Sequence, residues 1–136
     1  VVYNALWVFT HFSDENIQWL RTKRNFLIDI LLNKFDYDAG AKREGKVRMT
    51  LALLERLPIS AEDVRTDYLD YCLARINSLE PYGIRALCMK QAYRQCCYYP
   101  ELLNELRSEI ELMDTVPLSP GLEAARRNLM SKLQVK

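Results

Sequence analysis

The sequence predicts an all-α protein, a right-handed superhelix of about three and a half antiparallel helix pairs. Hydrophobic residues make up 49% of the 136 positions and recur at spacings of three and four, which indicates amphipathic helices. Only four glycines and five prolines are present, too few for a turn-rich β-sandwich or barrel. The helix pairs recur at a period near 38 residues, which is typical of an α-solenoid. A compact helical bundle is the alternative fold.

The first helix pair is expected at about residues 1–38. Val1 to Phe12 is predicted to be a helix that is apolar nearly all round, and Ser13-Asp14 supplies capping oxygens for the next start. A single long helix is expected from Glu15 to Phe35. Its apolar stripe consists of Ile17, Leu20, Leu27, Ile28, Leu31, Leu32 and Phe35. Arg24 lies on that stripe, where a charge needs a carboxylate partner or a path to water.

The segment Asp36–Gly45 is the clearest predicted loop, because it combines two glycines with alternating charges and has no apolar period. Its basic patch consists of Lys42, Arg43, Lys46 and Arg48. No aromatic residue interleaves with these cations, so a solvated loop is favoured over a phosphate or nucleic-acid contact.

The second repeat, again a pair of helices, is expected at about residues 42–79. Its first helix, Lys46 to Leu57, is apolar on two sides, with Val47, Leu51 and Leu54 on one face and Met49, Ala52 and Leu53 on the other. Pro58 ends this helix, and Ser60–Asp63 resembles a capping box. The helix that follows is expected to reach Leu79. Its stripe contains Val64, Tyr68, Cys72 and Ile76.

The third repeat is expected at about residues 80–117. Each of its two helices starts with a proline, Pro81 and Pro100. The first helix is again apolar on two sides, with one stripe of Ile84, Leu87, Cys88, Ala92 and Cys96 and a second of Ala86, Met89, Tyr93 and Cys97. Leu87 is therefore expected to be buried. The second helix is apolar on one side only, along Leu102, Leu103, Leu106, Ile110 and Met113. The short connection at Tyr98-Tyr99 requires antiparallel packing.

The last helix is predicted from Gly121 to about Lys132, with Ser119-Pro120 as its cap and first turn. It would form a partial or capping repeat at residues 118–136. The repeat is measured on equivalent positions: Val47 precedes Ile84 by 37 residues, and Ile84 precedes Leu122 by 38. In the second helices, a separation of 38 relates Val64, Tyr68 and Cys72 to Leu102, Leu106 and Ile110.

These segments resemble the HEAT and armadillo-like repeat family. The resemblance rests on IRALCMKQAYRQCCYYPELLNELRSEI, echoed by VRMTLALLERLPISAEDVRTDYLDYCL and by LEAARRNLMSKL, and it covers essentially residues 1–136 as one domain. It implies a non-catalytic scaffold whose second helices bind a protein or peptide. The candidate binding residues are Arg65, Asp67, Asp70, Asn104, Arg107 and Glu111. The family's acidic and basic ladder is patchy here, since Asp70 and Arg75 correspond to Glu109 and Met113. An Arg107–Glu111 pair would support its helix without any partner.

A second family implication is a nucleic-acid-binding protein, because HEAT-like DNA glycosylases that excise alkylated bases share this architecture. They use a basic groove with a catalytic Asp and aromatic residues. The 19 Lys and Arg residues against 18 Asp and Glu residues argue against a nucleic-acid partner. Trp7 and Trp19 fit helix packing equally well.

No catalytic, cofactor or metal site is expected. The sequence has no Gly-rich phosphate loop, no G-x-S-x-G and no H-E-x-x-H motif. The single histidine, His11, is distant from all four cysteines, which makes a zinc site or a Cys–His nucleophile improbable. Reduced thiols at Cys72, Cys88, Cys96 and Cys97 favour a cytoplasmic protein.

No apolar run is long enough to span a bilayer. The chain begins at Val1-Val2, without an initiator Met, and is expected to be a fragment or a processed form. The sequence does not indicate an oligomeric state.

Overall fold

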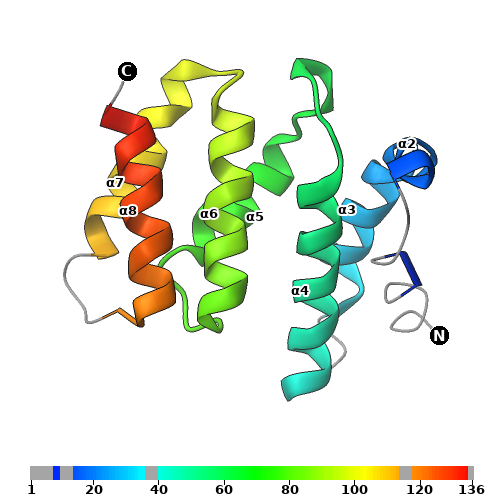
Figure 1. Cartoon of the computed structure of the whole chain (residues 1–136), viewed down its shortest axis with the longest axis horizontal. Helices are drawn as coiled ribbons and strands as arrows, with labels where there is room; N and C mark the ends of the chain where they lie inside the picture. Colours follow the sequence, from blue (N-terminus) through cyan, green and yellow to red (C-terminus); the bar gives the residue numbers. More distant parts are fainter. Residues whose placement is uncertain (1–7, 10–13, 36–39, 114–117, 135–136) are drawn as a thin grey trace. The chain divides into compact units, whose positions relative to one another are not determined.

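A computed structural model describes residues 8–9, 14–35, 40–113 and 118–134, and every regular element in them is helical (Figure 1). The fold class predicted from the apolar periodicity is confirmed. The chain divides into two compact units, Val1–Ile59 and Ser60–Lys136. The predicted helix over residues 1–12 lies outside the described residues except for Val8 and Phe9, and so do Trp7, His11 and Ser13.

The first unit contains α2 (Asp14–Arg21), α3 (Arg24–Asn33) and α4 (Gly40–Arg56). The prediction of one continuous helix from 15 to 35 was wrong, because a turn at Thr22 and Lys23 separates α2 from α3. The Thr22 amide and hydroxyl both donate to the Trp19 carbonyl, at 3.0 and 2.6 Å, and the Lys23 amide donates to the Leu20 carbonyl at 2.9 Å. These hydrogen bonds join each residue to the carbonyl three positions before it, as in a 3₁₀ turn, and they end α2.

The core of the first unit follows the predicted stripe, and α3 packs against α4 (Figure 1). The stripe residues that are buried are Ile17, Leu20, Leu27, Ile28, Leu31 and Phe35, whereas Leu32 is half-buried. Arg24 is buried among them, which is consistent with its position on the apolar stripe. Buried Thr50 of α4 donates its hydroxyl to the Lys46 carbonyl at 2.8 Å, which satisfies this polar group inside the core.

α4 begins six residues earlier than predicted. Gly40 has a φ of +60°, a conformation that favours glycine, and the helix starts there. The good helix formers that follow it continue the helix, so residues 40–45 of the predicted loop are helical and residues 36–39 lie outside the described part. Lys42, Arg43, Lys46 and Arg48 are therefore side chains of a helix and not of a loop.

The second unit contains η2 (Ala61–Asp63), α5 (Thr66–Arg75), α6 (Tyr82–Cys96), η3 (Pro100–Leu102), α7 (Leu103–Leu112) and α8 (Pro120–Gln134). The predicted capping box is present, and the Ser60 amide donates to the Asp63 carboxylate at 2.8 Å. It opens a 3₁₀ turn, and α5 starts only at Thr66 and ends before the predicted Leu79. The Ser119 cap is confirmed, because its hydroxyl accepts from the Leu122 amide at 3.3 Å.

α6 is the central helix of the second unit and packs against α5, α7 and α8 (Figure 1). Its buried residues are Ile84, Cys88, Met89, Gln91, Ala92, Gln95 and Cys96. The first predicted stripe is therefore buried except at Leu87, whereas Met89 is the buried member of the second stripe and Ala86, Tyr93 and Cys97 are half-buried. Leu87 is only half-buried, so its expected burial was wrong. The polar core residue Gln91 accepts a hydrogen bond from the buried Tyr68 hydroxyl at 3.0 Å, which joins α6 to α5.

Equivalent positions of the predicted repeat have equivalent environments. Val47, Ile84 and Leu122 are each only 1% exposed. Tyr68 and Leu106 are both fully buried, and so are Cys72 and Ile110. These matches support the period of 37–38 residues. The assignment of residues 1–136 to one domain, and the boundaries of the repeats within it, stay predictions.

Contacts between α6 and α8 show nearly the same spacing. A Cβ atom placed on Gly121 would lie 3.3 Å from the Tyr82 ring, and Lys132 Nζ lies 5.4 Å from the centre of the Tyr93 ring. Both pairs are 39 residues apart. The two helices therefore run parallel and in register, side by side in Figure 1, as the first helices of successive repeats must.

Candidate functional site

α5 and α7, the second helices of successive repeats, are joined at one edge. The side-chain amide of Asn77, just beyond α5, donates to the Glu109 carbonyl at 2.8 Å and to its carboxylate at 2.9 Å. We call the polar residues on these two helices and their flanking turns the α5–α7 surface: Arg65, Asp67, Asp70, Asn77, Asn104, Arg107, Glu109 and Glu111. This definition includes the six candidate residues from the sequence, whose part in binding stays a prediction.

Arg65 and Asp67 are brought together at the start of α5. Their side chains form a two-point ion pair, Nη2 to Oδ2 at 2.7 Å and Nε to Oδ1 at 3.1 Å. The Tyr68 amide also donates to the Asp67 carboxylate, at 2.8 Å. The hydrogen bond from Arg65 is the main reason that the pKa of Asp67 lies below its ordinary value. Asp67 is thus held as a charged, oriented carboxylate.

Asp70, Asn104 and Glu111 are exposed. Arg107 is different, because it is half-buried and its Nη2 donates to the Leu133 carbonyl near the end of α8, at 3.0 Å. The Arg107 guanidinium is thus directed to α8 and not to Glu111, the partner expected from the sequence. Arg107 therefore caps α8, where a cation at a helix C-terminus is favourable.

Charge is unevenly distributed among the helices of the second unit. The segment formed by η3 and α7 carries four carboxylates, Glu101, Glu105, Glu109 and Glu111, against the single cation Arg107. The first helices have the opposite balance: α6 contains Arg85, Lys90 and Arg94 with no carboxylate, and α8 contains Arg126, Arg127 and Lys132 with only Glu123. The α7 side of the α5–α7 surface is consequently acidic, which complements a basic partner.

The ladder expected from Asp70 and Arg75 is replaced by other contacts. The Arg75 guanidinium lies over the Tyr71 ring, with Cζ 3.4 Å from the ring centre, and its Nη1 donates to the Tyr71 carbonyl at 3.3 Å. Met113, at the position matching Arg75, is fully buried. The link between the two repeats is instead the Asn77–Glu109 contact, which the sequence pattern did not indicate.

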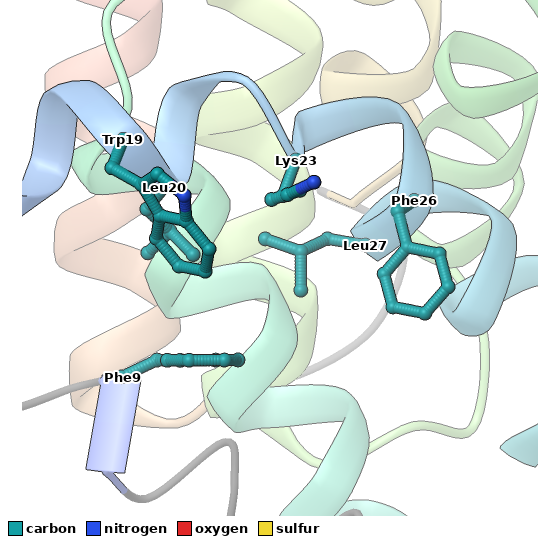
Figure 2. A pocket seen from close by; sticks show the side chains of 6 residues that line it. All are labelled: Phe9, Trp19, Leu20, Lys23, Phe26 and Leu27. Carbon is teal, nitrogen blue, oxygen red and sulfur yellow. The ribbon is translucent and has the colours of Figure 1, made fainter.

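A second candidate site is an apolar pocket in the first unit, with a cavity volume of about 300 Å³ (Figure 2). Its lining residues are Phe9, Trp19, Leu20, Lys23, Phe26 and Leu27. The Phe9 and Trp19 rings are tilted by 56° with centres 6.3 Å apart, and Lys23 Nζ lies 5.8 Å from the centre of the Trp19 ring. Trp19 is 51% exposed and Phe26 63%, so neither serves mainly as core packing.

The sequence contains a signal for this pocket. Trp19 and Phe26 are seven residues apart and lie outside the main apolar stripe of the 15–35 segment. Large apolar side chains at that spacing form a second apolar face on the polar side of a helix. Such a face indicates either a further packing partner or a binding site.

The described residues contain no group of three or more His, Cys, Asp and Glu side chains placed to hold a metal ion. All four cysteines are free, with Cys72, Cys88 and Cys96 buried and Cys97 half-buried. No helix in this part of the chain is long and apolar enough to cross a membrane.

Comparison with protein-family models gives a match. A family model described as a HEAT repeat domain matches residues 1–133. Neither the curated proteins nor the solved structures contain a match.

Proposed function

Because this chain belongs to the HEAT repeat domain family, we propose that it is a non-catalytic scaffold that binds a basic segment of a protein or peptide through its α5–α7 surface. Proteins of the repeat class present extended faces made of successive helices to their partners. The observation that carries the proposal is the contact of Asn77 with Glu109, which ties consecutive second helices to each other. A partner would therefore meet an ordered face.

The polar groups of the α5–α7 surface suit a cationic partner. Asp70 and Glu111 are exposed, and the Glu101 and Glu105 carboxylates extend the negative charge along α7. The Arg107 side chain is directed to the Leu133 carbonyl. Exposed carboxylates on neighbouring helical segments attract a basic segment and raise its association rate.

The acidic character of α7 also argues against the alternative of a nucleic-acid-binding protein similar to alkylated-DNA glycosylases. Such a protein tracks phosphates with cations, and carboxylates on the binding face would repel them. A cytoplasmic location belongs to the same proposal and is supported by the four free thiols.

Site-specific photocrosslinking tests the proposal. A photoreactive phenylalanine analogue at exposed Asn104 on α7 is expected to crosslink a partner in cells that express the full chain. The same analogue at exposed Lys90 on α6 is the matched control. The captured partner is then purified, and its Kd is measured for the chain carrying Asp70→Lys and Glu111→Lys together.

The double charge reversal is expected to weaken binding by at least about tenfold, since repulsive charges replace complementary ones. Glu123→Lys, an equally exposed reversal on α8, is expected to leave the Kd unchanged. Identical crosslinks from both positions, or equal affinities of the two variants, would show that the α5–α7 surface is not the binding site. Salt-sensitive binding of a DNA duplex that survives the double reversal would also overturn the proposal.

A further inference from the structure

We propose that the apolar pocket of the first unit is a separate binding site, which takes one bulky apolar side chain of a partner protein together with a nearby carboxylate. The proposal does not depend on the α5–α7 surface, which belongs to the other unit of the chain. It rests on the pocket's lining, its exposed aromatic rim and the position of Lys23.

The lining suits a large apolar side chain. Leu20 and Leu27 form the interior of the pocket and are almost completely buried, whereas Trp19 and Phe26 are more than half exposed. A volume of about 300 Å³ is enough for one leucine or phenylalanine anchor and lies at the lower end of ligand pockets. Exposed aromatic rings around a buried aliphatic floor are typical of interface hot spots, where a few anchors supply most of the binding energy.

Lys23 determines the charge of the partner. It is the one charged side chain among the six lining residues, and in the view of Figure 2 it lies with Leu27 between Trp19 and Phe26. Its ammonium group stays next to the Trp19 ring, 5.8 Å from the ring centre. A carboxylate on the partner could pair with this ammonium while the neighbouring apolar side chain enters the pocket. One helical turn spans about 5.4 Å, so an acidic residue adjacent to the anchor or one turn away would reach it.

The backbone around the pocket is already arranged for binding. The turn at Thr22 and Lys23, closed by bonds to the Trp19 and Leu20 carbonyls, places Trp19 on α2 and Phe26 on α3. The Leu27 amide continues from the turn by donating to the Lys23 carbonyl at 3.0 Å. A pocket whose walls are fixed before binding costs little conformational entropy when a partner enters.

Tryptophan fluorescence provides the test. The chain contains two tryptophans, so Trp7→Phe leaves Trp19 as the sole reporter. The probe is a short acetylated and amidated peptide with one phenylalanine flanked by glutamates. Two matched peptides replace the phenylalanine by alanine or the glutamates by lysines. The first peptide is expected to give a saturable shift of Trp19 emission, and each matched peptide an affinity at least about tenfold weaker.

Variants separate the two parts of the site. Phe26→Ser is expected to weaken binding of the phenylalanine peptide about tenfold or more, and Lys23→Glu is expected to weaken it while improving binding of the lysine peptide. Both side chains are exposed, so the folded state should be retained, as circular dichroism would verify. Lys90→Glu on α6, an exposed charge reversal outside both the pocket and the α5–α7 surface, is expected to leave the binding of all three peptides unchanged.

Several results would overturn the proposal. Equal binding of all three peptides, or no saturation at millimolar peptide, would mean that the pocket does not select an apolar anchor beside a carboxylate. A larger emission shift with phosphatidylcholine or phosphatidylserine vesicles would identify the patch as a membrane contact. Emission that depends on protein concentration without peptide would identify it as a contact between two copies of the chain.

Discussion

Asn77 uses a single side-chain amide to hold Glu109 at two points, the backbone carbonyl at 2.8 Å and the carboxylate at 2.9 Å. A primary amide has two N–H donors, so both acceptors can be satisfied at once. The two residues are 32 positions apart in the chain and belong to successive repeats. The contact thus stabilises the register between neighbouring second helices and not the structure of either helix alone.

Replacing Asn77 by alanine is expected to lower the free energy of unfolding by about 1 kcal/mol, because two hydrogen bonds are lost at an exposed position. Glu109→Ala should cost less, since the bond from Asn77 to the Glu109 carbonyl survives that substitution. Urea unfolding of the two single variants and the double variant would measure both effects and their coupling. Equal costs for the two single variants would contradict the two-point contact.

Leucines at three levels of burial should differ in the cost of truncation. Leu106→Ala is expected to destabilise by about 2–5 kcal/mol, because Leu106 is fully buried between α7 and its neighbours. Leu87→Ala should cost less than Leu106→Ala, since Leu87 is half-buried, and Leu112→Ala should be nearly neutral, since Leu112 is exposed. Midpoints of chemical unfolding would rank the three variants. A cost for Leu87→Ala equal to that of Leu106→Ala would argue for its full burial.

Cys96 should be resistant to alkylation and should make stability sensitive to high pH. Burial, with smaller contributions from Cys97 and Glu105, raises the pKa of the Cys96 thiol from 9.0 to about 12. The fold therefore favours the neutral thiol, and the associated stabilisation is complete below pH 9.0 and is lost as pH rises towards 12.

Mass spectrometry of protein treated with iodoacetamide at pH 8 is expected to show modification of half-buried Cys97 first. The buried Cys72, Cys88 and Cys96 should react only after denaturant is added. Modification of Cys96 at the same rate as Cys97 in the native protein would contradict its burial. Unfolding midpoints measured from pH 8 to 11 should fall, and Cys96→Ala should reduce that fall.

The repeat could be predicted because it depends on local patterns. Apolar positions such as Ile84 and Leu122 recur in phase with helical turns, and both are buried. The Ser119 hydroxyl and the Ser60–Asp63 capping box act within three residues, so they too were visible in the sequence. The match of a HEAT repeat domain family model over residues 1–133 confirms the repeat family predicted from these patterns.

The features that were missed depend on contacts between helices or on competition within a turn. The hydroxyl of Thr22 donates a hydrogen bond to the Trp19 carbonyl. This bond interrupts the helix, although the apolar period of the sequence continues across the interruption. Gln91 belongs to neither apolar stripe predicted for its helix, yet it is buried and accepts a hydrogen bond from the hydroxyl of buried Tyr68 on another helix.

The candidate site was identified only in part. Exposed Asp70 and Glu111 were recognisable as helix-surface residues, whereas the role of Arg107 was set by the Leu133 carbonyl, 26 residues away. Their part in binding stays a prediction. The pocket was missed because Trp19 was interpreted as a helix-packing residue, whereas its side chain is half exposed. The exposure of Trp19 depends on the turn that ends α2.

The parallel register of α6 and α8 has a consequence for how this chain can change in length. Inserting one residue within α6 would rotate every later side chain of that helix by about 100°. α6 contacts helices on more than one side, so no single rotation of the helix could restore all of its interfaces. Substitutions along α6 can therefore accumulate more readily than insertions or deletions. Length variation in related chains should concentrate in the connections, such as Cys97–Tyr99, where helical phase is not transmitted.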